Sequence, residues 1–255
     1  MDREYKKTIF SWSMYDFANQ PFTTLVVTFI YSTYFAQAIA PDEITGTVLW
    51  SRGITITALF VAFMSPLMGA IADQGGYRKA NLIFWTWICI IGSVMSYYAL
   101  PGEIYKALIW FVIANIGFEM GSVFCNAYLP SIAPKEKIGR ISGYGWSFGY
   151  VGGLLSLVIV LFLFINPEVP AFGFSKINGE HIRATNLLVA LWFAVFSLPT
   201  FIWLKDRKIE ERLSKKLIKS SYGRLKDTFR EIRKYKQISR FLLARILYND
   251  GLITI

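Results

Sequence analysis

Three carboxylates lie inside long apolar stretches of this sequence. Asp16, Glu119 and Asp250 each occur within a run that is otherwise mostly apolar and aromatic. A charge at the centre of a bilayer costs about 3 kcal/mol on insertion scales, so such residues usually face a partner, water or the interior of a helix bundle. We therefore interpret them as candidates for a proton relay or for binding the cationic group of a solute. The alternative is structural pairing, for example of Glu119 with Arg245 or of Glu119 with a helix N-terminus.

Amide side chains occur in the same apolar runs as the carboxylates. Asn19, Asn115 and Asn126 could line a cavity or hydrogen-bond a neighbouring helix, and helix packing is the simpler interpretation for each. The predicted substrate or proton pathway consists of Asp16, Asn19, Glu119, Asn126 and Asp250.

Long membrane helices are needed to hold these groups, and the composition predicts them. The chain has 255 residues, of which 54% are hydrophobic and 17% aromatic, and its mean hydropathy is +0.41. About 20 consecutive apolar residues span a bilayer as a helix. Six runs qualify, at 9–39, 49–71, 80–100, 106–129, 141–165 and 185–204. The sequence therefore predicts an all-α polytopic membrane protein, with a short acidic loop at 41–46 and a polar loop at 166–184.

The placement of the positive charge predicts the orientation of the bundle. With the N-terminus on the cytoplasmic side, 22 of the 27 Lys and Arg residues fall on the inner side and four on the outer side. This asymmetry is the positive-inside pattern. Most of the charge lies in one basic block at 205–240, directly after an apolar run, which is typical of a cytoplasmic linker near anionic lipid. The net charge of +10 is therefore attributed to the lipid bilayer as a partner, and no nucleic acid is expected.

A polar loop at 69–79 separates the second and third runs. Gly69 would let a neighbouring helix approach closely, and Asp73 could meet the positive N-terminus of another helix. Gly76 permits a reversing turn, and Arg78 and Lys79 hold the loop on the cytoplasmic side. The alternative is an ordinary Asp–Gly turn held by positive charge.

Three glycines in the fifth run are spaced for close helix packing. Gly145, Gly149 and Gly153 recur every fourth residue and therefore share one helix face. Small residues on one face let two membrane helices approach closely.

Several classes of chemistry find no support in the sequence. The chain has one histidine, His181, so it offers no histidine metal cluster. Cys89 and Cys125 lie in or at the end of apolar runs and are predicted to be reduced, buried residues. No phosphate-binding Gly-x4-Gly-Lys-Ser/Thr motif is present. We expect no enzyme, no cofactor and no bound metal.

The loop motif, taken with several shorter stretches, resembles one family. Gly69, Asp73, Gly76, Arg78 and Lys79 match the signature loop between helices two and three of the major facilitator superfamily, although Tyr77 replaces a basic residue. Further stretches resemble the vacuole-effluxer-like, autophagy-related branch of that superfamily. They are 15–19, 115–119, 126–130, 142–146 and 248–251. The fifth run departs from the superfamily's antiporter motif, because it lacks that motif's Gly-Pro pair.

The resemblance implies a fold, a function and partners. The fold would be the six-helix N-terminal half of a major facilitator transporter at 1–204, a cytoplasmic linker at 205–240, and the truncated start of a seventh helix at 241–255. The function would be efflux of a small solute such as an amino acid by alternating access, either proton-coupled or facilitated. Asp73 would pair with a helix end in a missing C-terminal half and so gate the cycle. The alternative is a membrane scaffold subunit without transport activity.

Overall fold

The computed structural model describes residues 3–206, 237–238, 240–241, 243–245 and 247–248. For residues 71 and 73–75 the description is confined to the backbone. Six stretches of the described part are long and apolar enough to cross a membrane: Arg3–Ile39, Glu43–Ala70, Arg78–Tyr97, Ile104–Ile132, Lys135–Ile165 and Ile177–Trp203. The six predicted helices are thus present. Most of the predicted linker and of the predicted seventh helix lies outside the described residues.

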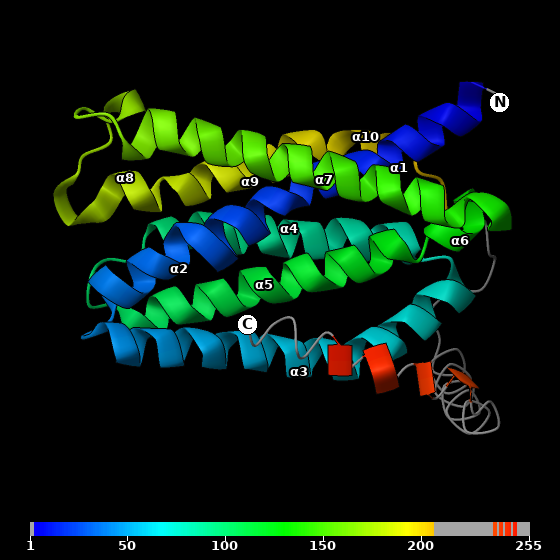
Figure 1. Ribbon diagram of the computed structural model, residues 1–255, viewed down its shortest axis with the longest axis horizontal. Helices are drawn as coiled ribbons and strands as arrows, with labels where there is room; N and C mark the ends of the chain where they lie inside the picture. Colours follow the sequence, from blue (N-terminus) through cyan, green and yellow to red (C-terminus); the bar gives the residue numbers. More distant parts are fainter. Residues whose placement is uncertain (1–2, 207–236, 239, 242, 246, 249–255) are drawn as a thin grey trace.

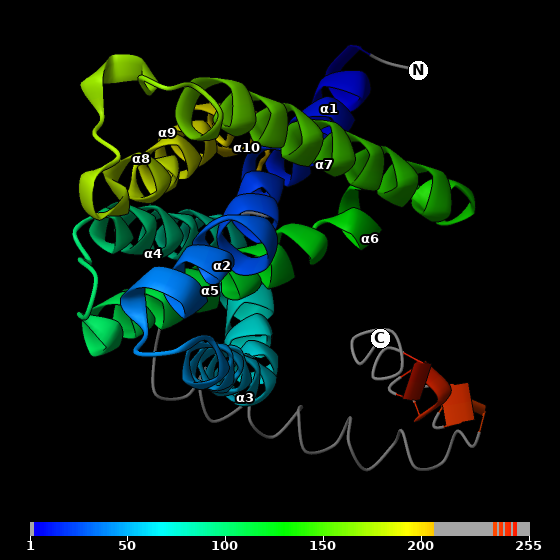
Figure 2. The same ribbon diagram turned by 60° about the vertical axis from the view of Figure 1, so that its left-hand side comes forward.

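The helices form an elongated bundle with the first helix in its middle (Figures 1 and 2). Helix α1 (Arg3–Pro21) packs against α7 (Ile138–Val160), α9 (Thr185–Phe196) and α10 (Leu198–Trp203). Helix α4 (Arg78–Tyr97) packs against α9 and α5 (Ile104–Asn126), and α5 also contacts α3 (Glu43–Gly75). The shorter segments are α2 (Tyr31–Tyr34), α6 (Leu129–Ile132), α8 (Glu180–Arg183), η1 (Phe22–Phe29), η2 (Phe35–Ile39), η3 (Lys135–Lys137), η4 (Leu161–Ile165), η5 (Ala171–Gly173) and η6 (Ile177–Gly179).

Pro21 changes the geometry of the first membrane segment. Proline has no N–H, so Pro21 cannot donate the helical hydrogen bond to the Phe17 carbonyl four residues earlier. Trp192 Nε1 on α9 donates to that carbonyl instead, at 3.1 Å. Beyond Pro21 the chain widens into the π-helical segment η1. A tryptophan from another helix therefore satisfies the backbone group that the proline leaves open, as a water-free environment requires.

Other hydrogen bonds join α1 to the helices around it. Trp12 Nε1 donates to the Cys125 carbonyl on α5 at 2.9 Å. The hydroxyl groups of Tyr15 and Thr86, on α1 and α4, are 2.8 Å apart. Polar contacts between buried side chains and other helices thus fix the rotation of α1, which decides which of its residues face the outside of the bundle.

The contact between α1 and α7 depends on glycine. A Cβ on Gly145 would lie 2.5 Å from Asp16 Oδ2, and a Cβ on Gly153 would lie 2.7 Å from Thr24 Oγ1. A Cβ on Gly152, which the predicted set did not include, would collide with the Phe17 carbonyl oxygen. Because these glycines have no side chain, the backbones of α1 and α7 approach closely. This close approach places Asp16 between the two helices.

The turns between helices are shorter than predicted. Helix α3 begins at Glu43, inside the loop predicted at 41–46, because Asp42 Oδ1 accepts a hydrogen bond from the Thr45 amide at 2.9 Å and caps the helix. The same bond lowers the pKa of Asp42. Helix α3 then continues through most of the loop predicted at 69–79 and ends at Gly75, with Gly76 in the left-handed conformation (φ 66°). Arg78 and Lys79 lie in the first turn of α4.

Helix α3 is the least covered of the six segments. In an apolar stretch of 18 residues taken from each segment, 11% of the stretch is buried for α3, compared with 33–44% for the other five segments. Its exposed apolar residues include Ile56, Leu59 and Phe63. A Cβ on Gly69 would meet nothing within 4 Å, so within the described residues Gly69 makes no close helix contact of the predicted kind.

Replacing Gly152 with alanine should weaken the bundle at the seam between α1 and α7. The added methyl group would press on the Phe17 carbonyl, and overpacking of this kind costs about 1–3 kcal/mol. The matched control is Gly143→Ala on the same helix, where a Cβ meets nothing within 4 Å. We expect the midpoint of thermal unfolding to fall for Gly152→Ala and to stay level or rise for Gly143→Ala. Equal midpoints would show that the glycine seam does not hold the helices together.

Candidate functional site

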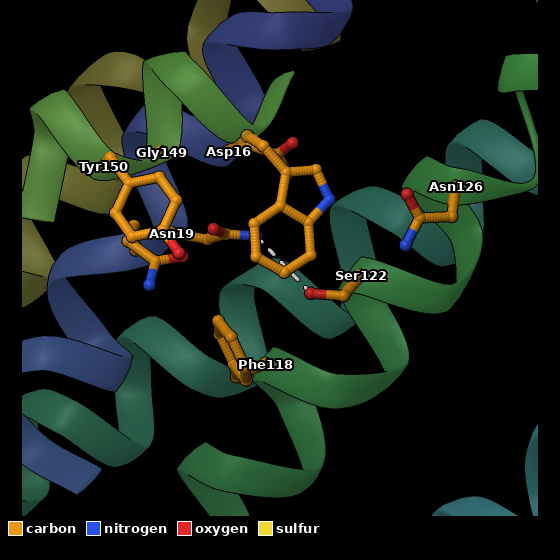
Figure 3. Close-up of a pocket in the computed structure, with 9 residues that line it drawn as sticks. Asp16, Asn19, Phe118, Ser122, Asn126, Gly149 and Tyr150 are labelled. Atoms are coloured by element: carbon orange, nitrogen blue, oxygen red, sulfur yellow. Dashed lines mark hydrogen bonds between the residues drawn. The ribbon is translucent and has the colours of Figure 1, made fainter. Parts of the chain in front are cut away.

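A pocket with a polar and aromatic lining opens between α1, α5 and α7. Its volume is about 170 Å³. Figure 3 shows Asp16 and Tyr150 on one side of this pocket and Ser122 and Asn126 on the other. The complete lining is Asp16, Asn19, Gln20, Phe118, Ser122, Asn126, Trp146, Gly149 and Tyr150. Three of the five residues predicted to form the pathway, Asp16, Asn19 and Asn126, are thus brought together.

Asp16 provides the carboxylate of this pocket. It is partly buried on α1, and its side chain lies along Gly145 and Gly149 of α7. A Cβ on Gly149 would be 3.5 Å from Asp16 Cβ. Any larger residue at position 145 would occupy the space of the Asp16 carboxylate. The glycines of α7 therefore have two effects. They let α1 and α7 pack closely, and they leave room for an acidic side chain at the wall of the pocket.

The described residues supply no positive charge to balance Asp16. The pocket lining contains no Lys, Arg or His. The salt bridge found in the described part of the chain joins Lys106 to Glu103, far from Asp16 in sequence and outside the pocket lining. An ionised carboxylate in an apolar setting is costly unless it is paired. Asp16 can lower this cost by taking up a proton or by contacting a cation supplied by a ligand.

Amides and a hydroxyl cover the neighbouring wall. Asn19, with an exposed fraction of 4%, donates from Nδ2 to Ser122 Oγ at 3.4 Å (Figure 3). This distance is long for a hydrogen bond, so the bond is weak. Asn126 is exposed, and among the described residues its side chain has no hydrogen-bond partner. Both amides can therefore bind a solute without breaking a strong internal bond.

Aromatic residues of α5 and α7 complete the lining. Trp146 and Tyr150 are one helical turn apart, their ring centroids are 6.1 Å apart, and their exposed fractions are 66% and 62%. Phe118 stacks on Phe22 of η1 at 5.3 Å. The sequence analysis did not select these three pocket residues, nor Gln20 and Ser122. Positions 118, 122 and 126 recur every fourth residue on α5. This spacing was the sequence signal that could have identified them as one helix face.

Two of the predicted pathway residues are not placed in the pocket. Glu119 is partly buried on α5, but it is not among the residues that line the pocket. Asp250 lies outside the described residues. Their roles in a pathway remain predictions.

A second polar cluster joins three helix ends near the turn between α3 and α4. Asp206, which follows α10, accepts a hydrogen bond from Tyr128 through Oδ1 and from the Lys79 amide through Oδ2, each at 2.9 Å. A carboxylate at the first turn of α4 is favourable for the helix dipole. The side chain of Asp73 lies outside the described residues, so its pairing with a helix end remains a prediction. In this part of the chain, the predicted gating loop is held by Asp206.

The described residues offer no metal-binding group. No cluster of three or more His, Cys, Asp or Glu side chains occurs among them. Cys89 and Cys125 are both free and buried.

Comparison with known proteins identifies the family. The sequence profile described as "Vacuole effluxer Atg22 like" matches residues 43–140 and 134–255. The chain belongs to the vacuole effluxer Atg22-like family. This family assignment, together with the relatives below, confirms the predicted resemblance.

Relatives of this family occur in bacteria and fungi. The chain is 25% identical over 259 residues to an uncharacterized MFS-type transporter, YxiO, of Bacillus subtilis (strain 168), covering 100% of the chain and 60% of the relative. It is 21% identical over 284 residues to autophagy-related protein 22 of Yarrowia lipolytica (strain CLIB 122 / E 150), covering 81% of the chain and 46% of the relative. The chain thus spans about half the length of these Atg22-like relatives.

Solved structures show the same fold. The proton:xylose symporter XylE, bound to 6-bromo-6-deoxy-D-glucose, matches with a TM-score of 0.61 and 13% identity over 92% of the chain and 52% of the symporter. A partially occluded inward-open XylE from E. coli matches with a TM-score of 0.60 and 14% identity, over 93% of the chain and 59% of that protein. The Atg22-like chain therefore has the six-helix N-terminal half of a major facilitator fold. The family, the relative and the solved structure are named as an effluxer and as transporters, which are not enzymes. This agrees with the prediction that the chain is not an enzyme.

The Asp206 cluster can be tested by a double-mutant cycle with Tyr128. Because Asp206 accepts two hydrogen bonds, Asp206→Ala should lower the free energy of unfolding by about 1.5–3 kcal/mol. Tyr128→Phe should cost less, and the effect of the pair should be smaller than the sum of the two single effects. Lys79→Ala is the control, since it keeps the amide that donates to Asp206. Additive losses in chemical denaturation would show that the two residues act independently.

Proposed function

We propose that this chain is the N-terminal half of an alternating-access secondary transporter in which the Asp16 pocket forms one wall of the site for a small solute. The observation that carries the proposal is a partly buried carboxylate without a cationic partner in the described residues, surrounded by available amides and aromatic rings. A group in this setting can bind a solute or carry a proton. The family and the relatives support transport as the activity.

The opposite wall of the site would come from a C-terminal half. The pocket opens at the surface of the bundle, beside the exposed residues Trp146, Tyr150 and Leu154 of α7. These positions recur every fourth residue and form an aromatic and apolar stripe. Together with the thinly covered helix α3, this stripe provides a surface for six further helices. Parallel repeats of this superfamily place solute sites between such halves.

Proton coupling is the second element of the proposal. Asp16 would be protonated in one state of the cycle and ionised in another, because its surroundings and access to water change as the halves move. Asp250, predicted at a similar depth in the seventh helix, would lie across the cavity. The solute would be a small molecule such as an amino acid, moved by exchange with protons or together with them.

The role of Asp16 can be tested by transport in proteoliposomes. In the full-length protein, a radiolabelled mixture of amino acids should accumulate in response to a pH gradient. Asp16→Asn should abolish that accumulation and leave solute exchange without a gradient measurable, because only the proton step is lost. Glu168→Gln, a change of the same chemistry at an exposed position, is the control.

The outcomes separate transport from the alternative of a membrane scaffold. If Asp16→Asn and Asp250→Asn both retain the pH dependence of the wild type, the carboxylates are structural and proton coupling is wrong. If the wild type takes up no labelled amino acid, and Asp16→Asn and Asn126→Leu leave partner assembly unchanged, the scaffold function is favoured.

The orientation of the bundle can be tested by cysteine labelling. The positive-inside pattern places the N-terminus and Lys135 in the cytoplasm and Asn178 outside. Both of these residues are exposed. In a cysteine-free protein, an impermeant maleimide added to intact cells should label Asn178→Cys and spare Lys135→Cys until the membrane is opened. The reverse pattern would contradict the orientation.

A further inference from the structure

We infer that the Asp16 pocket binds the ammonium group of an organic cation, held between the Asp16 carboxylate and the rings of Trp146 and Tyr150. This inference rests on the proposed function and names the class of solute for the same site. The solute would carry a primary or quaternary ammonium group and an apolar body of modest size. No anionic group of the solute would be needed for binding to this half.

The first argument is the charge of the lining. Nine residues line the pocket, and Asp16 is the one acidic residue, with no basic residue to oppose it. An anionic solute would be repelled by an ionised Asp16 and would find no guanidinium or ammonium in this wall. A neutral solute could satisfy the amides, but it would leave the partly buried carboxylate without a balancing charge. A cation offsets that cost.

The second argument is the position of the aromatic rings. Asp16 Oδ2 lies against the backbone of Gly145, the residue immediately before Trp146. Trp146 and Tyr150 lie one turn apart with an interplanar angle of 42° and are mostly exposed. A cation gains from lying over the face of a tryptophan or tyrosine ring, and most from tryptophan. The carboxylate and both rings thus line one pocket beside α7.

The third argument is the supply of acceptors and of an apolar surface. The amide oxygens of Asn126 and Asn19, together with the Ser122 hydroxyl, can accept hydrogen bonds from a primary ammonium group. None of them is held by a strong internal bond in the described structure. Phe118, stacked on Phe22, offers an apolar floor for the remainder of the solute. The wall therefore has a polar end and an apolar end.

The ammonium group and a proton would compete for Asp16. A cation binds the ionised carboxylate, so its binding at a pH where Asp16 is protonated must release a proton to the buffer. The other titratable groups facing Asp16 are Tyr15 on α1, Cys125 on α5 and Tyr150 on α7. Phenols and thiols titrate at alkaline pH in water, and α9 and α10 contain no titratable residue. Glu119 on α5 is a second partly buried carboxylate, so proton release is assigned to Asp16 when Asp16→Asn abolishes it.

A set of four probes with the same phenyl ring tests the charge requirement. Phenethylamine is a cation, L-phenylalanine a zwitterion, 3-phenylpropionate an anion and 2-phenylethanol neutral. Binding to the purified full-length protein is measured by calorimetry in two buffers of different ionisation enthalpy, which counts the protons released. We expect phenethylamine to bind at least about tenfold more tightly than 2-phenylethanol and to release protons on binding.

Matched variants assign the effect to the pocket. Asp16→Asn should weaken phenethylamine binding at least about tenfold and abolish the proton release. Trp146→Leu should weaken it about two- to fivefold, the range of an exposed cation–π contact. Trp87→Leu is the control, because Trp87 is an exposed tryptophan on α4 that does not line the pocket. Thermal unfolding of each variant verifies its fold.

Several results would overturn the inference. Equal binding of phenethylamine and 2-phenylethanol would show that the charge is not recognised, and binding of neither by the wild type would exclude an aromatic ammonium solute. At least about tenfold tighter binding of L-phenylalanine than of phenethylamine would show that recognition requires the solute's carboxylate. If these results accompany loss of pH-driven accumulation in Asp16→Asn, the proposed transport function stands and the cation inference alone fails.

Discussion

The close contact between α1 and α7 is the constraint on which the described structure depends. In a bilayer, helices gain little from burying apolar surface against each other, so their association depends on tight packing and on satisfied polar groups. The glycines of α7 provide the packing by allowing the α1 backbone to approach. The same approach encloses the Phe17 carbonyl, which Pro21 leaves without its helical donor and which Trp192 then binds. A wider separation of the helices would lose the packing and the enclosure of this carbonyl together.

Charged side chains in the described part of the chain differ in whether they have a hydrogen-bond partner. Arg183 is buried, but its Nη1 donates to the Tyr97 carbonyl at 2.6 Å, and its guanidinium lies 5.4 Å from the centroid of the Tyr97 ring. Asp206 is likewise bound by a hydroxyl and an amide. Asp16 has no comparable partner within the described residues. Since buried polar groups are normally paired, this isolation is the observation behind the proposal that a solute or a proton compensates Asp16.

The sequence predicted the helices well and their ends poorly. Hydrophobic runs identified all six membrane segments, because a spanning helix needs a length of apolar sequence that few other structures require. The polar residues at 41–46 and 69–79 were assigned to loops, yet α3 begins at Glu43 and ends at Gly75. A capping aspartate and a left-handed glycine set these ends, and both depend on local hydrogen bonds that hydropathy does not record. The π-helical segment after Pro21 likewise does not follow from hydropathy.

What the sequence by itself determined is the fold class, the candidate carboxylate and the glycine face, because each follows from residue type and spacing along one helix. What only the tertiary structure decided is which helix faces meet. Asp16 and Asn126 were chosen for their chemistry, but Trp146, Tyr150 and Phe118 join them because α1 is rotated and held by hydrogen bonds to three other helices. Glu119, equally acidic, does not line the pocket, although it lies on the same helix as Phe118 and Ser122. The rotation of each helix about its own axis is set by contacts between residues distant in sequence, and no pattern within a single helix contains that information.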